Sequence, residues 1–556
     1  MSVYLAPVGN GQVFLTSTGL PANNGYIYTY QAGTTTPAVT YTTSLGNVAN
    51  TYPIRLTPAG MAPAEIWLTG GQAYKFVVTD VFSNPIGVSP YDNLYGINDP
   101  QAGGQTLPAT SVTYTPPGAG AVATTVGAKL SRGIVDIVDY GAKCDGVTND
   151  IAAINEGLTY LAVRGGGILR IPVSNVLTDP FVLPDYVTLA GMSRGPLIAH
   201  ALPSGTTTVG GTCLLVNSTA STFVTLQGEC SSIEDLAIYY PQQVAPSAAA
   251  PNAYPYSVTM PNGYSGGNMV RRCIIINAYD GIYAGNSGFL IEDTYVGAFH
   301  NDFCVDDDSE VAHIVNCKAQ VMWDIFANLS YPQNIDAWVM SNSIGAMRIL
   351  RADNLNLANF ACFNRQYGMV LTDSPLAGSP KNSYGKATNI DLDTVKYGIY
   401  ADSTDNVGFG WKMANVDIGS DGTGITGVYC NTGGGSAPDL LICGGSIRGT
   451  WSAGTYVRNA GNLIFRDFQG IKIGANSVPG PVAAPVIPAS GTPLANPYAM
   501  RCQVCINGGT FTGSAVQIGG TSTGNPNSPQ VIILDPYETV TLNYSSAPTW
   551  LWFALQ

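Results

Sequence analysis

Short apolar segments recur through the middle of the chain with a regular spacing. In each one, apolar residues alternate with others, a polar turn follows, and a glycine then introduces two more apolar residues. Segments of this kind begin near residues 290, 314, 338, 389, 413, 440 and 463, often about 24 residues apart. Alternation with a period of two predicts strands. A repeat in the twenties is typical of a β-solenoid rather than of a hairpin-linked barrel or sandwich.

Asparagine and aspartate close many of these strands, as Asn277 and Asn316 do. Their short polar side chains can satisfy the backbone groups of a turn, so we expect them to stack as a ladder at one corner of the solenoid. Asp391 and Asp393 alternate on one strand. Because Asp393 falls near the recurrent turn position, its pattern favours a structural role in this ladder.

A single amphipathic helix is predicted just before the repeats. Asn149 or Asp150 can cap its start, and the glycine run at 165–167 ends it. Its apolar stripe consists of Ile151, Ile154, Leu158 and Leu161. A solenoid leaves apolar side chains uncovered at its open end, so we expect the helix to cover that end.

Composition divides the chain into five segments and predicts an all-β fold. Residues 1–99 alternate in short runs between turn clusters, which predicts a small antiparallel β domain. Residues 100–133 and 474–500 are rich in Gly, Pro and Ala and are predicted to be linkers, the first with room for a short helix. Residues 134–473 hold the repeats. Residues 501–556 alternate again and form a second small β domain.

Residues 135–191 resemble the opening of pectate-lyase-like parallel β-helix proteins. The matching residues are Asp139-Tyr140-Gly141-Ala142, Asp145-Gly146, Asn149-Asp150, Gly165-Gly166-Gly167 and Ile171-Pro172. Cys144 and Asn149 depart from the family pattern, but neither departure changes the fold that the pattern indicates. The resemblance implies a right-handed parallel β-helix over 134–473, and it is specific for fold rather than for activity.

The flanking segments resemble parts of bacteriophage tail proteins. The virion-anchoring domain of podovirus tailspikes and tail fibres is similar to residues 24–37, 52–54, 74–77 and 92–94, and small terminal β domains are similar to residues 507–510 and 547–550. The resemblance implies a homotrimer that attaches to virion tail or portal-proximal proteins through residues 1–99. It also implies binding or cleavage of a bacterial surface polysaccharide, with no required organic cofactor.

The charge balance limits the partners that the chain can have. With 36 acidic and 23 basic residues the net charge is −13, which argues against nucleic-acid binding. A polyanion would also be repelled unless a local pocket overcame the repulsion. No apolar run predicts membrane insertion, and no signal peptide is evident. Eleven scattered cysteines fit folding in a reducing cytoplasm rather than a metal site. We therefore expect a virion component that is assembled in the host cytoplasm.

The densest acidic segment provides the candidate site. Glycosidases need a carboxylic acid that protonates the leaving oxygen and a carboxylate that acts as base or nucleophile, and aromatic rings can stack on sugar faces. The catalytic candidates are Asp306, Asp308, Asp324 and Asp336, and the substrate-binding candidates are Trp323, Tyr331 and Trp338. Asp306 and Asp308 share a face if the chain is extended there, and the others follow roughly one solenoid turn later.

Three functions stay open at this point. The first is a tailspike that depolymerises capsule or lipopolysaccharide by hydrolysis, or by lyase chemistry in which Lys318 and Tyr331 take part. The second is a non-catalytic tail fibre that binds the same glycan. The third is a structural adaptor whose final β domain docks another tail protein. The acidic segment with its aromatic neighbours favours the first.

Overall fold

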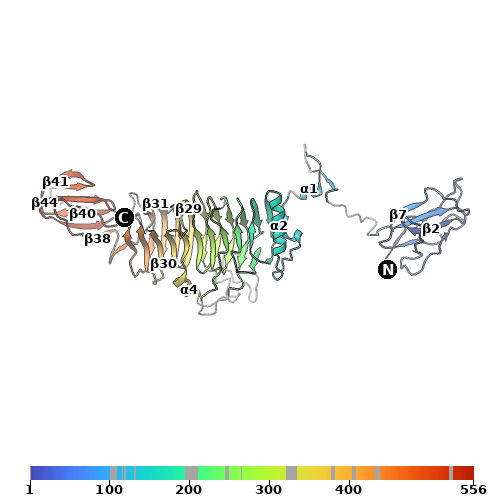
Figure 1. The fold of residues 1–556 in the computed structure, drawn as a ribbon, viewed down its shortest axis with the longest axis horizontal. Coiled ribbons are helices and arrows are strands. Elements are labelled where there is room, and N and C mark those ends of the chain that lie inside the picture. The colour runs from blue at the N-terminus through green and yellow to red at the C-terminus, as the bar shows by residue number, and fades with distance from the viewer. Residues whose placement is uncertain are drawn as a thin grey trace. The chain divides into compact units, whose positions relative to one another are not determined.

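The computed structural model divides into two compact units, Met1–Gly133 and Ile134–Gln556 (Figure 1). The residues that the structure describes are 2–99, 109–115, 117, 121–130, 133–194, 211–243, 250–263, 266–320, 335–376, 382–403, 408–432, 439–524 and 530–555. Among them, no helix is long and apolar enough to cross a membrane.

Two small antiparallel sheets form the core of the first unit, with strand orders β1-β5-β3 and β4-β2-β6-β7. Their strands are β1 (Val3–Leu5), β2 (Tyr26–Gln31), β3 (Thr40–Tyr41), β4 (Ile54–Arg55), β5 (Trp67–Thr69), β6 (Tyr74–Thr79) and β7 (Tyr91–Leu94). The side chains of Ile27, Ile66 and Phe76 are buried in this unit. The segment 100–133 contains β8 (Thr113–Tyr114), β9 (Thr124–Thr125) and the short helix α1 (Val126–Leu130).

The predicted helix opens the second unit. After β10 (Val135–Asp136) and a 3-10 turn (Ile137–Tyr140), α2 (Ile151–Val163) lies at one end of the solenoid. Asp150 is the N-cap residue, but its side chain forms no capping hydrogen bond with the helix. Asn149 accepts a hydrogen bond of 3.2 Å from the N–H of Ile151, and the Asp150 carboxylate binds two N–H groups of the preceding turn. The buried face of α2 consists of Ala153, Ile154, Gly157, Leu158 and Leu161.

Strands β10 to β35 form one sheet of 26 strands, coiled into a right-handed parallel β-helix. Each turn contributes to three faces. The first face holds β11 (Gly167–Arg170), β14 (Val187–Ala190), β17 (Ser232–Glu234), β20 (Met269–Arg271), β23 (Leu290–Glu292) and β26 (His313–Val315). The second holds β12 (Asn175–Thr178), β15 (Cys213–Val216), β18 (Ala237–Tyr239), β21 (Ile274–Ile276), β24 (Tyr295–Gly297) and β27 (Lys318–Gln320). The third holds β13 (Phe181–Leu183), β16 (Val224–Leu226), β19 (Val258–Met260), β22 (Asp280–Ala284), β25 (Asn301–Val305) and β28 (Gly345–Ile349).

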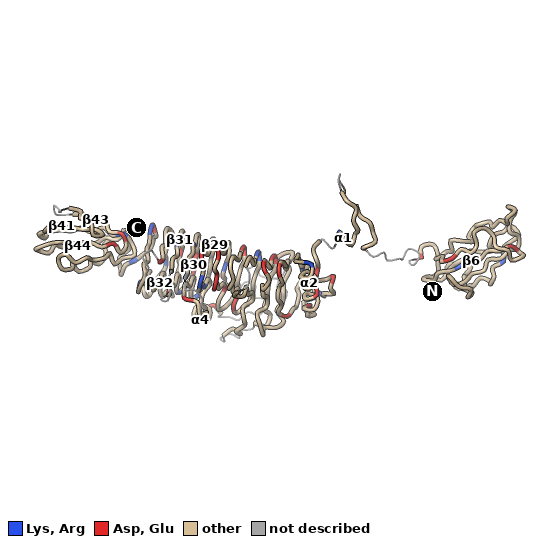
Figure 2. Tube along the Cα trace, turned by 45° about the horizontal axis from the view of Figure 1, so that its top comes forward, with Lys and Arg blue, Asp and Glu red and all other residues tan. Residues whose placement is uncertain are grey.

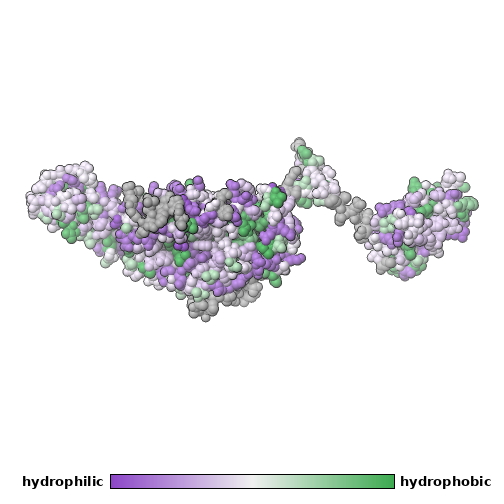
Figure 3. Space-filling view, in the orientation of Figure 1, coloured by the Kyte–Doolittle hydropathy of each residue, from purple (hydrophilic) through white to green (hydrophobic). Residues whose placement is uncertain are grey.

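Later strands continue around the corners. The strands β29 (Ala352–Thr372) and β30 (Asn382–Ser403) each pair along all three faces. The first and second faces then receive β31 (Gly408–Gly419) and β33 (Leu440–Arg448), the third receives β32 (Thr426–Thr432) and β34 (Tyr456–Ala460), and β35 (Leu463–Arg466) completes the first. The visible face of the solenoid is mainly hydrophilic (Figure 3).

Apolar side chains stack from turn to turn inside the solenoid. On the first face the inward residues lie in register and are at most 1% exposed: Ile233, Val270, Ile291, Ile314 and Leu357. One predicted repeat differs. The segment that begins near residue 338 is not a strand but the helix α4 (Ile335–Asn342), because its buried residues Ile335 and Val339 are one helical turn apart.

The predicted asparagine ladder is present at the corner between the first and second faces. Its members are Asn316, Asn359, Asn389 and Asn415, joined by side-chain hydrogen bonds of 2.7, 2.9 and 2.9 Å. All four have a φ of 54–56°, a left-handed conformation that asparagine tolerates better than most residues. Asp393 is not part of this ladder. In the solenoid turn that contains Asp393, the ladder position is occupied by Asn389.

The segment 474–500, predicted to be a linker, lies against the last turn of the solenoid instead. There β37 (Asn476–Ser477) pairs with β36 (Lys472–Ile473), and β38 (Gly480–Val482) and β39 (Pro493–Ala495) join the sheets of the C-terminal domain. Val478 and Met500 are buried. A Pro- and Gly-rich composition suits edge strands and turns as well as linkers, which explains the difference.

The C-terminal domain consists of two four-stranded antiparallel sheets, ordered β38-β45-β40-β43 and β39-β44-β41-β42. The strands are β40 (Cys502–Asn507), β41 (Thr510–Ile518), β42 (Thr521–Gly524), β43 (Gln530–Leu534), β44 (Thr539–Ser546) and β45 (Thr549–Ala554). Its buried residues belong to the same apolar cluster as those of the solenoid.

Candidate functional site

Four of the predicted site residues can be placed. Asp306 and Asp308 directly follow β25 on the third face, and Asp336 and Trp338 lie in α4. The remaining three, Trp323, Asp324 and Tyr331, lie outside the described residues.

Asp306 and Asp308 are buried carboxyls. The Asp306 carboxylate accepts hydrogen bonds from the Asp307 N–H at 2.9 Å and the Tyr283 hydroxyl at 3.4 Å, and burial raises its pKa. One oxygen of Asp308 accepts a 3.3 Å hydrogen bond from the Glu310 N–H, and the other has no partner among the described residues. Burial raises the pKa of Asp308 to about 7. With 1% and 0% exposure, neither carboxyl lies where a polymer could contact it.

The helix α4 carries one carboxyl, Asp336, and one aromatic ring, Trp338. Asp336 accepts a 2.8 Å hydrogen bond from the Asn364 amide, and burial raises its pKa. The Trp338 ring lies 6.2 Å from that of Tyr279, which in turn stacks on His300 at 4.7 Å. Trp338 also packs on the small apolar cluster beneath the helix, so part of its ring has a structural role.

Three other carboxyls gather on the outer side of the second face. Asp391 and Asp393 lie two residues apart on β30, and Asp417 on β31 is in register with Asp391. The neighbouring Leu392 and Ile418 are fully buried, so the acidic side chains point outward. The side chain of Asp391 is 57% exposed and can be reached from solvent.

The surroundings of these carboxyls are uneven. Burial, followed by the charges of Asp393 and Asp417, raises the pKa of Asp391. Arg448, whose guanidinium lies 3.9 Å from the Asp391 carboxylate, acts in the opposite direction. The Ser446 hydroxyl donates a 2.5 Å hydrogen bond to Asp417 and fixes its orientation. The raised pKa of Asp391 therefore suits this residue to hold a proton. The fixed orientation of Asp417 suits its carboxylate to act as a nucleophile.

The register also sets the spacing that the chemistry needs. Neighbouring strands of a sheet lie about 4.8 Å apart. Retaining glycosidases place their two carboxyl groups about 5 Å apart, one as acid and one as nucleophile. Asp391 and Asp417 are in register on neighbouring strands, so the strand spacing favours the retaining arrangement. The sequence draws attention to Asp391 and Asp393, but Asp417 joins them only through a register that the sequence does not reveal.

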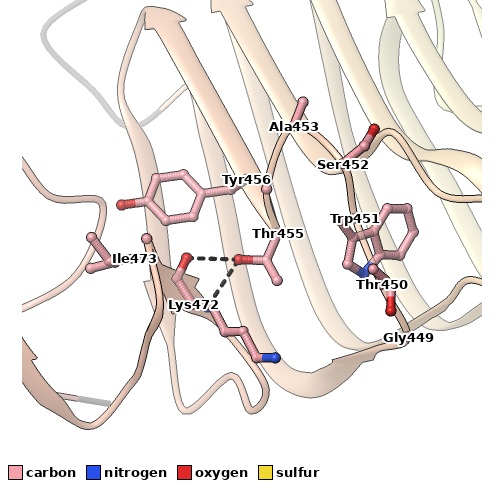
Figure 4. Close-up of a pocket in the computed structure, with 11 residues that line it drawn as sticks. Gly449, Thr450, Trp451, Ser452, Ala453, Thr455, Tyr456, Lys472 and Ile473 are labelled. Atoms are coloured by element: carbon pink, nitrogen blue, oxygen red, sulfur yellow. Dashed lines mark hydrogen bonds between the residues drawn. The ribbon is translucent and has the colours of Figure 1, made fainter. Parts of the chain in front are cut away.

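A pocket of about 550 Å³ lies next in the chain after Arg448, the residue that contacts Asp391. It is lined by residues 449–456, which follow Arg448, and by residues 472–474 (Figure 4). The Trp451 indole N–H donates a hydrogen bond of 3.2 Å to the Arg448 carbonyl. The Thr455 hydroxyl bonds to both the N–H and the carbonyl of Lys472, which holds β36 against the last turn. The pocket thus has fixed walls on both sides.

No group of three or more histidine, cysteine or acidic side chains within the described ranges is arranged to hold a metal ion. Each of the eleven cysteines is a free thiol.

No family model matches the sequence, and no curated protein matches it. Among solved structures, a mutant tailspike of E. coli bacteriophage HK620 with a bound hexasaccharide aligns at 11% identity and a TM-score of 0.47, covering 65% of each chain. Tailspike gp49 of Acinetobacter baumannii bacteriophage Fri1, a capsular polysaccharide depolymerase, aligns at 11% identity over 76% of this chain and 86% of its own, with a TM-score of 0.35. An exopolygalacturonase from Thermotoga maritima aligns at 14% identity over 60% and 92%, with a TM-score of 0.34. These likenesses concern the fold alone.

Proposed function

We propose that the chain is a bacteriophage tailspike that binds and depolymerises a bacterial surface polysaccharide, either capsule or lipopolysaccharide. The observation that carries the proposal is the outward-facing pair Asp391 and Asp417, in register on neighbouring turns beside Asp393. The cleavage site is placed here rather than at Asp306 and Asp308 because those two carboxyls are buried. The proposed reaction is glycoside hydrolysis.

In the proposed mechanism Asp391 is the general acid, since its raised pKa keeps it protonated at a higher pH than an ordinary aspartate. It donates its proton to the glycosidic oxygen as the bond to the leaving sugar breaks. The Asp417 carboxylate, oriented by Ser446, attacks the sugar carbon and forms a covalent intermediate. Water, deprotonated by Asp391, then releases the sugar with retention of configuration.

The test is the release of reducing ends from host polysaccharide by the purified full chain. Asp391→Asn and Asp417→Asn should each lower the rate at least about 100-fold, the usual range for lost acid–base or nucleophilic groups. Asp421→Asn, an exposed turn residue close in sequence, is the matched control and should retain activity.

Loss of activity in Asp306→Asn with full activity in Asp391→Asn would move the site to the third face. A wild-type chain that binds polysaccharide but releases no reducing ends would favour the non-catalytic fibre.

The proposal includes a homotrimer whose subunits meet along the first face. The support is a shallow apolar hollow of about 470 Å³ on the outside of that face, with Ala358, Ala414 and Leu441 among its lining residues. A neighbouring subunit that covered these side chains would remove their apolar surface from water. Leu441→Glu should lower the molecular mass measured by sedimentation from three chains to one. Val486→Glu, at an exposed residue of the second unit, should leave the mass unchanged.

The unit Met1–Gly133 is proposed to attach the spike to virion tail or portal-proximal proteins, because it has a core of its own. The free thiols support assembly in the reducing host cytoplasm before release in the virion. Particles assembled with a chain that lacks residues 2–99 should carry no spike.

A further inference from the structure

We infer that the pocket lined by residues 449–456 and 472–474 binds a carboxylate-bearing sugar unit, so that the polysaccharide is an acidic one. The inference rests on the proposed function, since it names the substrate class of the same chain.

The lining suits one or two sugar units. A volume of about 550 Å³ falls in the range of small-ligand sites. Trp451, which is 9% exposed, and the partly buried Tyr456 line the pocket with the accessible parts of their rings, and Thr450 and Ser452 contribute hydroxyls. Rings that cover apolar sugar faces, with a few polar groups to bind sugar hydroxyls, make up the usual architecture of such a site.

The charge selects an acidic unit. Lys472 lines the pocket and forms no ion pair with any residue that the structure describes. Figure 4 shows the Lys472 side chain among the lining residues, extending below Thr455. Lys472 is the one basic residue among those that line the pocket; nearby, Arg448 is paired with Asp391 and Arg458 lies over the ring of Tyr537. Figure 2 shows basic positions among these last strands of the solenoid. A chain with net charge −13 repels a polyanion at long range, so a cation inside the pocket would supply the local attraction that an acidic sugar unit needs.

The position connects the pocket with the proposed cleavage site. Arg448 lies 3.9 Å from Asp391 and directly precedes the first lining residue, Gly449. The hydrogen bond from Trp451 to the Arg448 carbonyl ties the two regions together. A polysaccharide strand that crosses Asp391 and Asp417 can therefore place a neighbouring unit in the pocket.

The experiment measures binding to an array of purified bacterial surface polysaccharides, each in native form and after chemical reduction of its carboxylates to alcohols. The full chain carries Asp417→Asn to prevent cleavage. The expected result is that every retained polysaccharide bears carboxylates and that carboxyl reduction weakens binding at least tenfold. Lys472→Met should lower the affinity for the native form at least tenfold and abolish the difference between the two forms.

Two controls keep the result specific. Lys472→Arg should retain the preference for the native form, because it keeps the charge. Lys143→Met removes an exposed lysine at the opposite end of the solenoid and should bind as the parent does. Retention of neutral polysaccharides, or a Lys472→Met chain that still distinguishes the two forms, overturns the inference but not the proposed function. Failure to retain any polysaccharide overturns both.

Discussion

Asp308 and Asp391 are both carboxyls whose pKa is raised by burial, but their surroundings differ. Asp308 has no exposed surface, and one of its oxygens lacks a hydrogen-bond partner among the described residues. Asp391 faces solvent beside Arg448. A closed environment stabilises the neutral acid in place, whereas an open one allows the proton to pass to a substrate. The two residues therefore lead to different predictions.

Asp308→Asn should change how stability depends on pH. The folded protein holds the Asp308 proton up to a pH of about 7, whereas the unfolded chain loses it near the ordinary value of 3.8. Ionisation therefore favours the unfolded chain, and this residue destabilises the fold increasingly as pH rises from about 4 to 7. Asparagine resembles the neutral acid and removes that effect. The difference in unfolding temperature between the variant and wild type should therefore increase by a few degrees from pH 5 to pH 7, as measured by calorimetry. An equal difference at both pH values would contradict a buried neutral Asp308.

Arg448→Met should move the alkaline limit of the cleavage reaction. The Arg448 cation lowers the pKa of Asp391 and so opposes the effect of burial and of the neighbouring carboxylates. Without it the pKa rises further, and the acid stays protonated to a higher pH. The pH at which kcat falls to half on the alkaline side should therefore increase, as measured from initial rates across the pH range. Lys396→Met, five residues after Asp391 on β30 and hydrogen-bonded to Ser341, should leave the profile unchanged. An unchanged limit in Arg448→Met would exclude Asp391 as the group that titrates.

Among the elements, the asparagine ladder offers the sharpest test of the solenoid corner. Asn389 donates to Asn359 and accepts from Asn415, and it has a φ of 55°. Asn389→Ala should lose both hydrogen bonds, at about 0.5–1.5 kcal/mol each, and add a left-handed alanine at about 1–2 kcal/mol. Asn389→Gly should lose only the hydrogen bonds, because glycine adopts this φ freely. Denaturant unfolding should rank the stabilities as wild type, then glycine, then alanine. Equal losses in the two variants would contradict the backbone part of this account.

The same elements mark how far the sequence could predict the structure. The ladder and the inward apolar stacks follow from residue types within single strands, so their pattern is visible in the sequence. The register is not, because turns differ in length: Val270 and Ile291 are in register 21 residues apart, but Ile314 and Leu357 are 43 apart. Asp391 and Asp417, separated by 26 residues, could therefore not be matched from sequence alone. The burial of Asp306 and Asp308 depends on the same tertiary information.

At the scale of the whole molecule, the solenoid has a different kind of cover at each end of its core. At its start α2 buries Ile154, Leu158 and Leu161 of the predicted apolar stripe, and Ile151 is partly buried beside them. At the other end, Phe468 and Ile471 of the last turn lie in one apolar cluster with Val478, Val482 and Met500. The segment 474–500 and the C-terminal domain therefore do for the final turn what α2 does for the first.

Removal of residues 474–556 should accordingly destabilise the solenoid itself. Phe468 and Ile471, at most 2% exposed in the full chain, would face water, and an uncovered apolar end of a parallel sheet promotes aggregation. We expect a lower unfolding temperature by circular dichroism and aggregates by light scattering. Deletion of residues 2–133 is the matched control. That unit has its own core, so the remaining chain should unfold at the same temperature as the solenoid of the full protein. If the chain that lacks 474–556 also unfolded unchanged and stayed dispersed, the segment 474–500 would be a linker after all, and the last turn would need no cover.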